Sequence, residues 1–304
     1  FLINNFDWSF EKSFAKSLYK GEFLTKLKNV NYETKNVEKY KDDTTSEFYG
    51  AVGYLATMDL VKYSEKNSSH LLKPKLLLRY APNHMKKLDG DYPLYNENIF
   101  SLDRLGSTTN FEGGTSATIG FNYSNKFKGN ELDFSIGQII NEKKTNKNKP
   151  SSSSLDKRFS DVVGSLNFDN KNNFKLKYDY ALDQGYKKAN YNNLDLDYKI
   201  ENISFNLNYM DEEKLLNRQE YVKSSIKIKG SEKGLFSFTT KRDLITDSSE
   251  YYKLSYEYLN DCLRAGLVYR REFYDDSELE PENTLMFTIT LSPFASIETP
   301  SFGN

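Results

Sequence analysis

The chain has 304 residues, with 42 basic and 43 acidic side chains and a net charge of −1, which argues against a general nucleic-acid-binding protein. Only 38% of the residues are apolar and the mean hydropathy is −0.72, yet 15% are aromatic, whereas a disordered chain is poor in aromatic residues. No uncharged apolar run approaches the ~20 residues of a membrane-spanning helix, so a helical membrane protein is excluded.

The N-terminal half is predicted to contain strands with irregular connections. Segments 48–63, 70–81, 116–125 and 131–140 alternate apolar and polar residues, and weaker candidates are 5–17 and 23–33. Since successive strand side chains point to opposite faces, segment 116–125 is expected to present one shared outward face, made of Ala117, Ile119, Phe121 and Tyr123.

Two connections in this half are unusual. The stretch between Pro82 and Thr115 is long, and its apolar and aromatic residues favour an ordered, functional loop. The stretch from Lys149 through Ser154 is low in complexity and is predicted to be a mobile outer loop.

The C-terminal half alternates much more clearly. Segments 173–182, 192–200, 202–210 and 219–229 each place apolar residues on one face and polar residues on the other, and the pattern continues to 284–292. In this last segment Leu285, Phe287, Ile289 and Leu291 share the apolar face, and Thr284, Thr288, Thr290 and Ser292 share the polar face.

A soluble β-sandwich also alternates in this way, but three features favour a membrane barrel. The segments approach the ~9–11 residues that cross a bilayer at a tilt, Tyr and Phe recur at their ends, and short connections alternate with long ones such as Asp243–Glu250. We therefore predict an all-β, antiparallel, transmembrane outer-membrane β-barrel with about 14 to 15 strands. Because the chain starts at Phe1 without a signal segment, we expect residues 1–304 to be an incomplete, C-terminal portion of a larger barrel.

No catalytic motif, paired zinc spacing or cofactor-binding motif is present, and two histidines, His70 and His84, offer little acid–base chemistry, so we expect no enzyme and no cofactor. The predicted lumen face carries charges that indicate either a mixed-charge wall or an attraction for anionic headgroups; they are Lys223, Lys227, Lys229, Arg264, Arg270 and Glu272. Cys262 is placed at a periplasmic turn, where it is either an inert thiol or part of a bridge to another segment or chain.

Two groups of motifs resemble one family. The first covers 72–82, 98–106 and 110–115, and the second covers 256–262, 268–273 and the pair Glu280-Pro281. Together they look like the barrel of the LPS-assembly protein LptD, or organic-solvent-tolerance, family, over roughly residues 45–295. The loop residues that carry the first resemblance are Asn98, Phe100, Asp103, Arg104 and Gly106.

The resemblance implies a large barrel preceded by a periplasmic jellyroll, with the jellyroll and the early strands lying outside this chain. It also implies three partners: lipopolysaccharide, an LptE-like plug lipoprotein, and an LptA-like periplasmic bridge that binds through the absent N-terminal domain. Cys262 matches the family's late cysteine, which bridges to cysteines near the mature N-terminus; no such partner is present in this chain.

The resemblance also implies that the last strand forms one edge of a lateral gate through which lipopolysaccharide enters the outer leaflet. Its residues are Thr284, Leu285, Phe287, Thr288, Ile289, Thr290, Leu291 and Pro293. Pro293 has no N–H to donate and is expected to weaken the seam. The alternative function is a general porin or solute channel of the outer membrane.

Overall fold

The computed structural model describes residues 1–14, 18–36, 43–64, 68–83, 85–88, 90–145, 147–214, 217–230, 233–260, 263–273, 282–291, 295–298 and 302–303. The predictions made for His84, Cys262 and Pro293 lie outside these residues. Within them no helix is both long and apolar enough to cross a bilayer.

The described residues form 19 strand segments and one short 3-10 helix, η1 (Ser151–Ser153). Fifteen of the segments have eight or more residues, which agrees with the 14 to 15 strands predicted. The strands are β1 (Leu2–Phe14), β2 (Tyr19–Thr34), β3 (Asp43–Met58), β4 (Leu60–Ser64), β5 (Ser68–Ala81), β6 (Gly114–Phe127), β7 (Asn130–Thr145), β8 (Lys157–Phe159), β9 (Val162–Asp169), β10 (Phe174–Leu182), β11 (Ala189–Ile200), β12 (Ile203–Glu212), β13 (Gln219–Lys229), β14 (Gly234–Asp243), β15 (Ser248–Leu259), β16 (Leu263–Glu272), β17 (Glu282–Leu291), β18 (Ala295–Glu298) and β19 (Phe302–Gly303).

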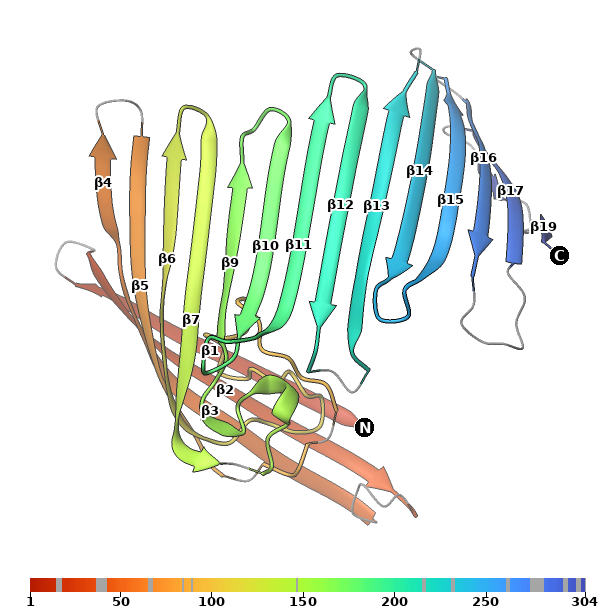
Figure 1. Ribbon diagram of the computed structural model, residues 1–304. Coiled ribbons are helices and arrows are strands. Elements are labelled where there is room, and N and C mark those ends of the chain that lie inside the picture. The colour runs from red at the N-terminus through yellow and green to blue at the C-terminus, as the bar shows by residue number, and fades with distance from the viewer. Residues whose placement is uncertain are drawn as a thin grey trace. The chain divides into compact units, whose positions relative to one another are not determined.

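The chain divides into two compact units, and strands β9, β10 and β11 each contribute residues to both of them. In unit 1, β1, β2, β3, β5, β6 and β7 pair antiparallel with their neighbours in that order, and β4 pairs with β5. In unit 2, β12 to β17 pair antiparallel in chain order, and Figure 1 shows them side by side. The antiparallel all-β prediction is confirmed.

From β5 to β14 the connection lengths alternate as predicted. The two-residue turn Lys128-Gly129 and the connections 170–173, 201–202 and 230–233 are short, whereas 82–113, 146–156, 183–188 and 213–218 are longer. Both Lys128 and Gly129 have positive φ, which suits the right-handed twist of a two-residue hairpin.

The long loop predicted for Asp243–Glu250 is wrong, because only Leu244 to Asp247 separate β14 from β15. The Asp243 carboxylate accepts the backbone N–H groups of Ile245 (2.8 Å) and Thr246 (2.9 Å), and this side-chain turn lets both strands extend further than the pattern indicated.

The apolar faces of the unit 2 strands are exposed. Phe287 is 47% exposed, Ile289 46% and Tyr256 51%, and among the described residues no second layer covers them. A β-sandwich must bury such faces against another sheet, so the sandwich alternative does not fit.

In unit 1 the opposite sheet face, away from the exposed apolar side chains, is covered by chain from the long connections. We call residues 82–113, of which 84 and 89 are not described, the packed loop. Its Leu102 and Phe111 join a buried cluster with strand residues such as Leu77, and its Leu94 and Ile99 join a second one with Ile139. The predicted ordered loop therefore supplies much of the apolar core of unit 1.

The prediction of a mobile loop over Lys149–Ser154 is wrong. Ser152, Ser153 and Ser154 are buried, and Ser153 donates to the carbonyl of Pro150 at 2.7 Å within the turn that forms η1. Low complexity indicated solvation, but the hydroxyls of these three serines donate to backbone carbonyls, Ser152 to Gly90 of the packed loop and Ser153 and Ser154 within their own segment, so the turn is buried with these groups paired.

Candidate functional site

Asn98 organises the packed loop. Its side-chain amide donates to the carbonyls of Pro93 (3.2 Å) and Arg104 (3.1 Å), and its side-chain oxygen accepts the backbone N–H of Tyr95 (2.9 Å). Gly106 follows with a φ of +58°, a left-handed conformation that favours glycine. Both predicted family-like residues thus fix the path of the loop backbone.

Phe100 seats the loop on β6 and β7 because two glycines leave room for it. A Cβ added at Gly120 would lie 3.0 Å from the Phe100 ring, and one added at Gly137 would lie 3.4 Å from that ring and 3.0 Å from Ile99. The ammonium of Lys75 lies 5.3 Å from the centre of the Phe100 ring, within reach of a cation–π interaction.

A buried cluster of charges fastens the end of the loop to β5 and to the segment before η1. Glu112 accepts two bonds from the Arg104 guanidinium, one of them 2.7 Å from Nε, and another from Lys149 Nζ at 2.9 Å. Arg79 Nη1 lies 4.0 Å from the same carboxylate. Glu112 is 0% exposed and the two arginines 2% each, so the cluster is removed from bulk water.

Arg79 also holds the loop backbone directly. Its Nε donates to the Leu102 carbonyl at 2.7 Å, its Nη1 donates to the Gly114 carbonyl at 3.2 Å, and its Nη2 donates to the Glu112 carbonyl. One side chain of β5 therefore ties down three points of the chain that returns to β6.

A second pair lies beside this cluster. Lys28 of β2 bonds to the Asp103 carboxylate at 2.9 Å and donates to the Asn110 carbonyl at 3.2 Å, with both charged side chains 5% exposed. Four buried cations (Lys28, Arg79, Arg104 and Lys149) thus face two carboxylates, Asp103 and Glu112, and the site carries two excess positive charges.

The excess of cations decides the ionisation of Glu112. Burial alone would raise the pKa of this carboxyl, but the attraction of Arg104, Arg79 and Lys149 outweighs burial and holds the pKa well below its ordinary value of 4.5. Burial lowers the pKa of the Lys149 ammonium, and Glu112 opposes that shift. Glu112 is therefore a carboxylate at neutral pH.

Sequence reasoning found the five loop residues and the structure brings them together, but it did not select Arg79, Glu112 or Lys149 as site residues. Arg79 carries a usable signal, since it stands between the apolar residues Leu77 and Ala81 on the buried face at the end of β5. Lys149 gives none, because it stands in the low-complexity stretch.

A polar groove runs along β15 to β17 in unit 2. It holds about 580 Å³ and collects six of the predicted residues: Arg264, Arg270, Glu272, Thr284, Thr288 and Thr290. Arg264 Nε donates to Glu257 at 2.9 Å, and Arg270 pairs with Glu272 at 2.5 Å. With Lys253 and Glu282 the groove holds three cations and three carboxylates, which favours the mixed-charge interpretation of this wall.

The remaining predicted residues are divided between other places. Lys223, Lys227 and Lys229 lie exposed on the polar face of β13, and Lys227 lines a different pocket, with Lys199 and Ser225. Leu285, Phe287 and Ile289 lie exposed on the apolar face of β17, and Leu291 ends that strand.

In the part of the chain that is described, no three His, Cys, Asp or Glu residues come close enough together to hold a metal ion. His70 instead lies 2.8 Å from the Tyr123 hydroxyl and 3.2 Å from Ser68, from neighbouring positions in the sheet.

The sequence profile of LptD, described as LPS transport system D, matches residues 5–241. The chain belongs to the LptD family. It is therefore an outer-membrane β-barrel chain of the lipopolysaccharide transport system, and the outer-membrane location predicted from the alternating strands is confirmed. The match runs from within β1 to within β14 and includes the packed loop, but ends before 256–281, the block that carries the second resemblance in the sequence.

No curated protein matches this LptD-family chain. Solved structures that resemble it include a Rhodopseudomonas blastica porin triple mutant, with 10% identity, a TM-score of 0.38, and coverage of 98% of this chain and 93% of the porin. Another, described as "Asymmetric conductivity of engineered proteins", has 10% identity, a TM-score of 0.37, and coverage of 92% and 91%. A TM-score below 0.5 does not establish a shared fold, so the family assignment rests on the profile match.

Proposed function

We propose that this LptD-family chain inserts lipopolysaccharide into the outer leaflet through a lateral seam of the barrel, with β17 as one edge, and that it does so without catalysis. The support is the uneven pairing of β17. Among the described residues, all ten residues of β17 pair with β16 on one side, whereas on the other β18 pairs with four of them and β19 with two.

A sparsely paired edge is the arrangement a seam needs. Unpaired backbone groups are costly in hydrocarbon, so an edge that opens must give up few pairings when it does. The two faces of β17 also suit the two halves of an amphipathic lipid, since the threonines line the polar groove and Phe287 and Ile289 lie exposed on the apolar face.

We further propose that an LptE-like lipoprotein occupies the polar side of unit 2 and that an LptA-like bridge delivers the lipid. The support for the plug is that Lys223, Lys227 and Lys229 stay exposed on that side, whereas in unit 1 the packed loop covers the corresponding face.

Locking the seam tests the proposal. In the full-length protein, a disulfide between a cysteine at Thr288 and one on the strand that faces β17 across the seam should stop the appearance of new lipopolysaccharide at the cell surface, and a reductant should restore it. The matched control joins β16 to β17 through Val268→Cys and Met286→Cys, which are directly opposite each other away from the seam. Export that continues with the seam locked would refute the proposal, and high ion conductance without export would favour a channel.

A further inference from the structure

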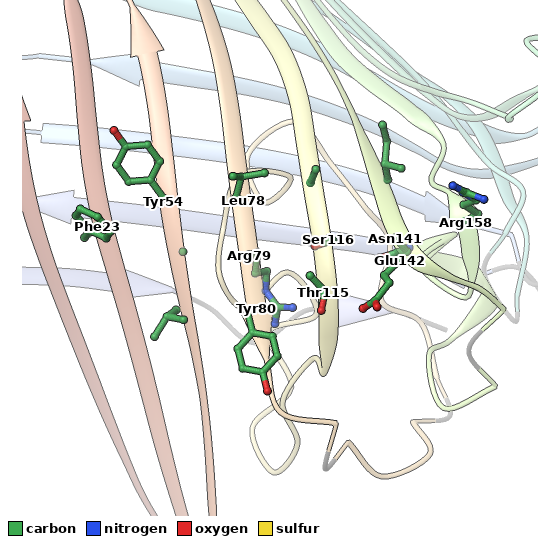
Figure 2. Close-up of a pocket in the computed structure, with 14 residues that line it drawn as sticks. Phe23, Tyr54, Leu78, Arg79, Tyr80, Thr115, Ser116, Asn141, Glu142 and Arg158 are labelled. Atoms are coloured by element: carbon green, nitrogen blue, oxygen red, sulfur yellow. The ribbon is translucent and has the colours of Figure 1, made fainter.

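The exposed face of unit 1, opposite the packed loop, carries an apolar groove of about 570 Å³. In Figure 2, Phe23, Tyr54, Leu78 and Tyr80 line one side of it, and Glu142 and Arg158 lie on the other, with Thr115 and Ser116 between. The volume falls within the ~300–1,000 Å³ typical of ligand sites.

Strand register explains why a groove forms here. Ala117 stands directly opposite Leu78 on β5 and Ile140 on β7, and Thr115 stands opposite Tyr80. A small side chain between two large ones on the same face leaves a channel, because its neighbours on both sides project further. Leu78 and Tyr80 are 50% and 55% exposed, so this wall stands open to the surroundings of the barrel.

At one end the groove is lined by two charged side chains, Arg158 and Glu142. Their sequence neighbours Lys157 and Lys143 are exposed but do not line it. Within the described residues no carboxylate pairs with Arg158. An arginine on a lipid-facing wall is stabilised by an anionic partner, and its planar guanidinium is especially suited to a phosphate.

The charged end lies on the long-loop side of the sheet. Tyr80 precedes the packed loop by two residues, Thr115 follows it by two, and Glu142 lies three residues before the end of β7, whereas the short Lys128-Gly129 turn closes the other end of β6. Long loops of outer-membrane barrels face the cell exterior, so the groove opens into the outer leaflet.

We propose that this groove binds the lipid end of lipopolysaccharide, with one acyl chain along Ala117 between Leu78 and Ile140 and a phosphate at Arg158. The inference rests on the proposed delivery of lipopolysaccharide to the outer leaflet, and it places a binding site on β3 to β8, far along the chain from the seam strand β17. We assign lipopolysaccharide as the occupant because the groove opens into the outer leaflet and the family transports that lipid.

Two variants test the groove, each with a matched control. Ala117→Trp fills the channel, and its control Ala265→Trp places the same ring on the apolar face of β16, outside the groove. Arg158→Gln removes the charge, and its control Arg271→Gln changes an exposed arginine near the end of β16, beside Phe273. All four proteins are purified full-length in mild detergent with their partner lipoprotein.

Binding of purified lipopolysaccharide should fall about tenfold or more in Ala117→Trp and Arg158→Gln, the loss expected when a charged contact or a packed chain is removed, and should be unchanged in both controls. Dephosphorylated lipopolysaccharide should bind the wild type as weakly as intact lipopolysaccharide binds Arg158→Gln. Equal losses in the controls, or full binding of the dephosphorylated lipid, would overturn the proposal. Equal competition by phosphatidylglycerol would also overturn it, because the groove would then hold any anionic lipid.

An export assay distinguishes the groove proposal from the seam proposal. Cells with Ala117→Trp should still deliver lipopolysaccharide to the surface, while the purified variant loses bound lipid. The seam-locked protein should show the reverse, with lost export and unchanged binding in the groove, so a failure of either proposal is recognised independently of the other.

Discussion

Replacing Glu112 by glutamine should release the packed loop. The substitution keeps the size of the side chain but removes the carboxylate that faces Arg79, Arg104 and Lys149, and it leaves three buried cations without their counter-charge. Arg104 has no reserve of partners, since its Nη1 already lacks a hydrogen bond.

The magnitude follows from the burial of the group. Removing one partner of a buried ion pair costs ~3–5 kcal/mol, and Glu112 is fully buried. At 1.36 kcal/mol per factor of ten, that loss enlarges the opening constant of the loop roughly 150- to 4,500-fold. Restoring the charge balance with Lys149→Met in the same chain should recover part of the loss, because the two sites are coupled.

Hydrogen exchange followed by mass spectrometry measures the effect directly. Amides of 99–112 should exchange faster by that factor in Glu112→Gln, while amides of β13 and β14 keep their rates. Glu97→Gln is the matched control, since Glu97 is an exposed carboxylate of the same loop. If the amides of 99–112 exchanged at the same rate in both variants, the charge cluster would not hold the loop and the reasoning would be refuted.

Three further outcomes are expected. On acidification, burial raises the pKa of Glu112 but the three cations outweigh it and hold the pKa below its ordinary 4.5, so the stabilisation by this carboxylate is complete above pH 4.5 and is lost as pH falls through the lower folded value. Loop proteolysis should rise only in that acidic range, and Glu112→Gln should not show the rise. Gly120→Ala should lower the temperature at which the barrel loses its folded mobility on gels, because the new Cβ meets the Ile136 carbonyl at 2.2 Å and overpacking costs ~1–3 kcal/mol; an unchanged transition would contradict this. Arg264→Gln should change stability by less than ~1 kcal/mol, since its partner Glu257 shares an exposed groove, and denaturant titration would show a larger effect if the pair were structural.

The strands were predicted best where one face of a strand meets lipid and the other face meets water. From β12 to β17 one face of each strand is mostly apolar and many of its side chains are exposed, so the period of two could be recognised without knowing any contact. Even the weak candidates 5–17 and 23–33 are full strands, β1 and β2.

The anchors of the packed loop could not be predicted in the same way, because they join distant segments. Lys28 reaches Asp103 across 75 positions, Arg79 reaches Leu102 across 23, and Lys149 reaches Glu112 across 37. Glu112 stood in the quoted motif, but its partners lie in other parts of the chain, and periodicity carries no information about such pairs.

The anchoring of the packed loop also has a consequence for biogenesis. The charged end of the packed loop can bind its partners only after β2, β5 and the segment that carries Lys149 have folded into place. Contacts between residues far apart in the sequence form slowly. Until then the six charges stay hydrated and the apolar clusters incomplete. Glu112 therefore becomes buried only when this wall of the barrel is fully assembled. A quality-control protease that cleaves 82–113 would degrade immature chains and spare mature ones.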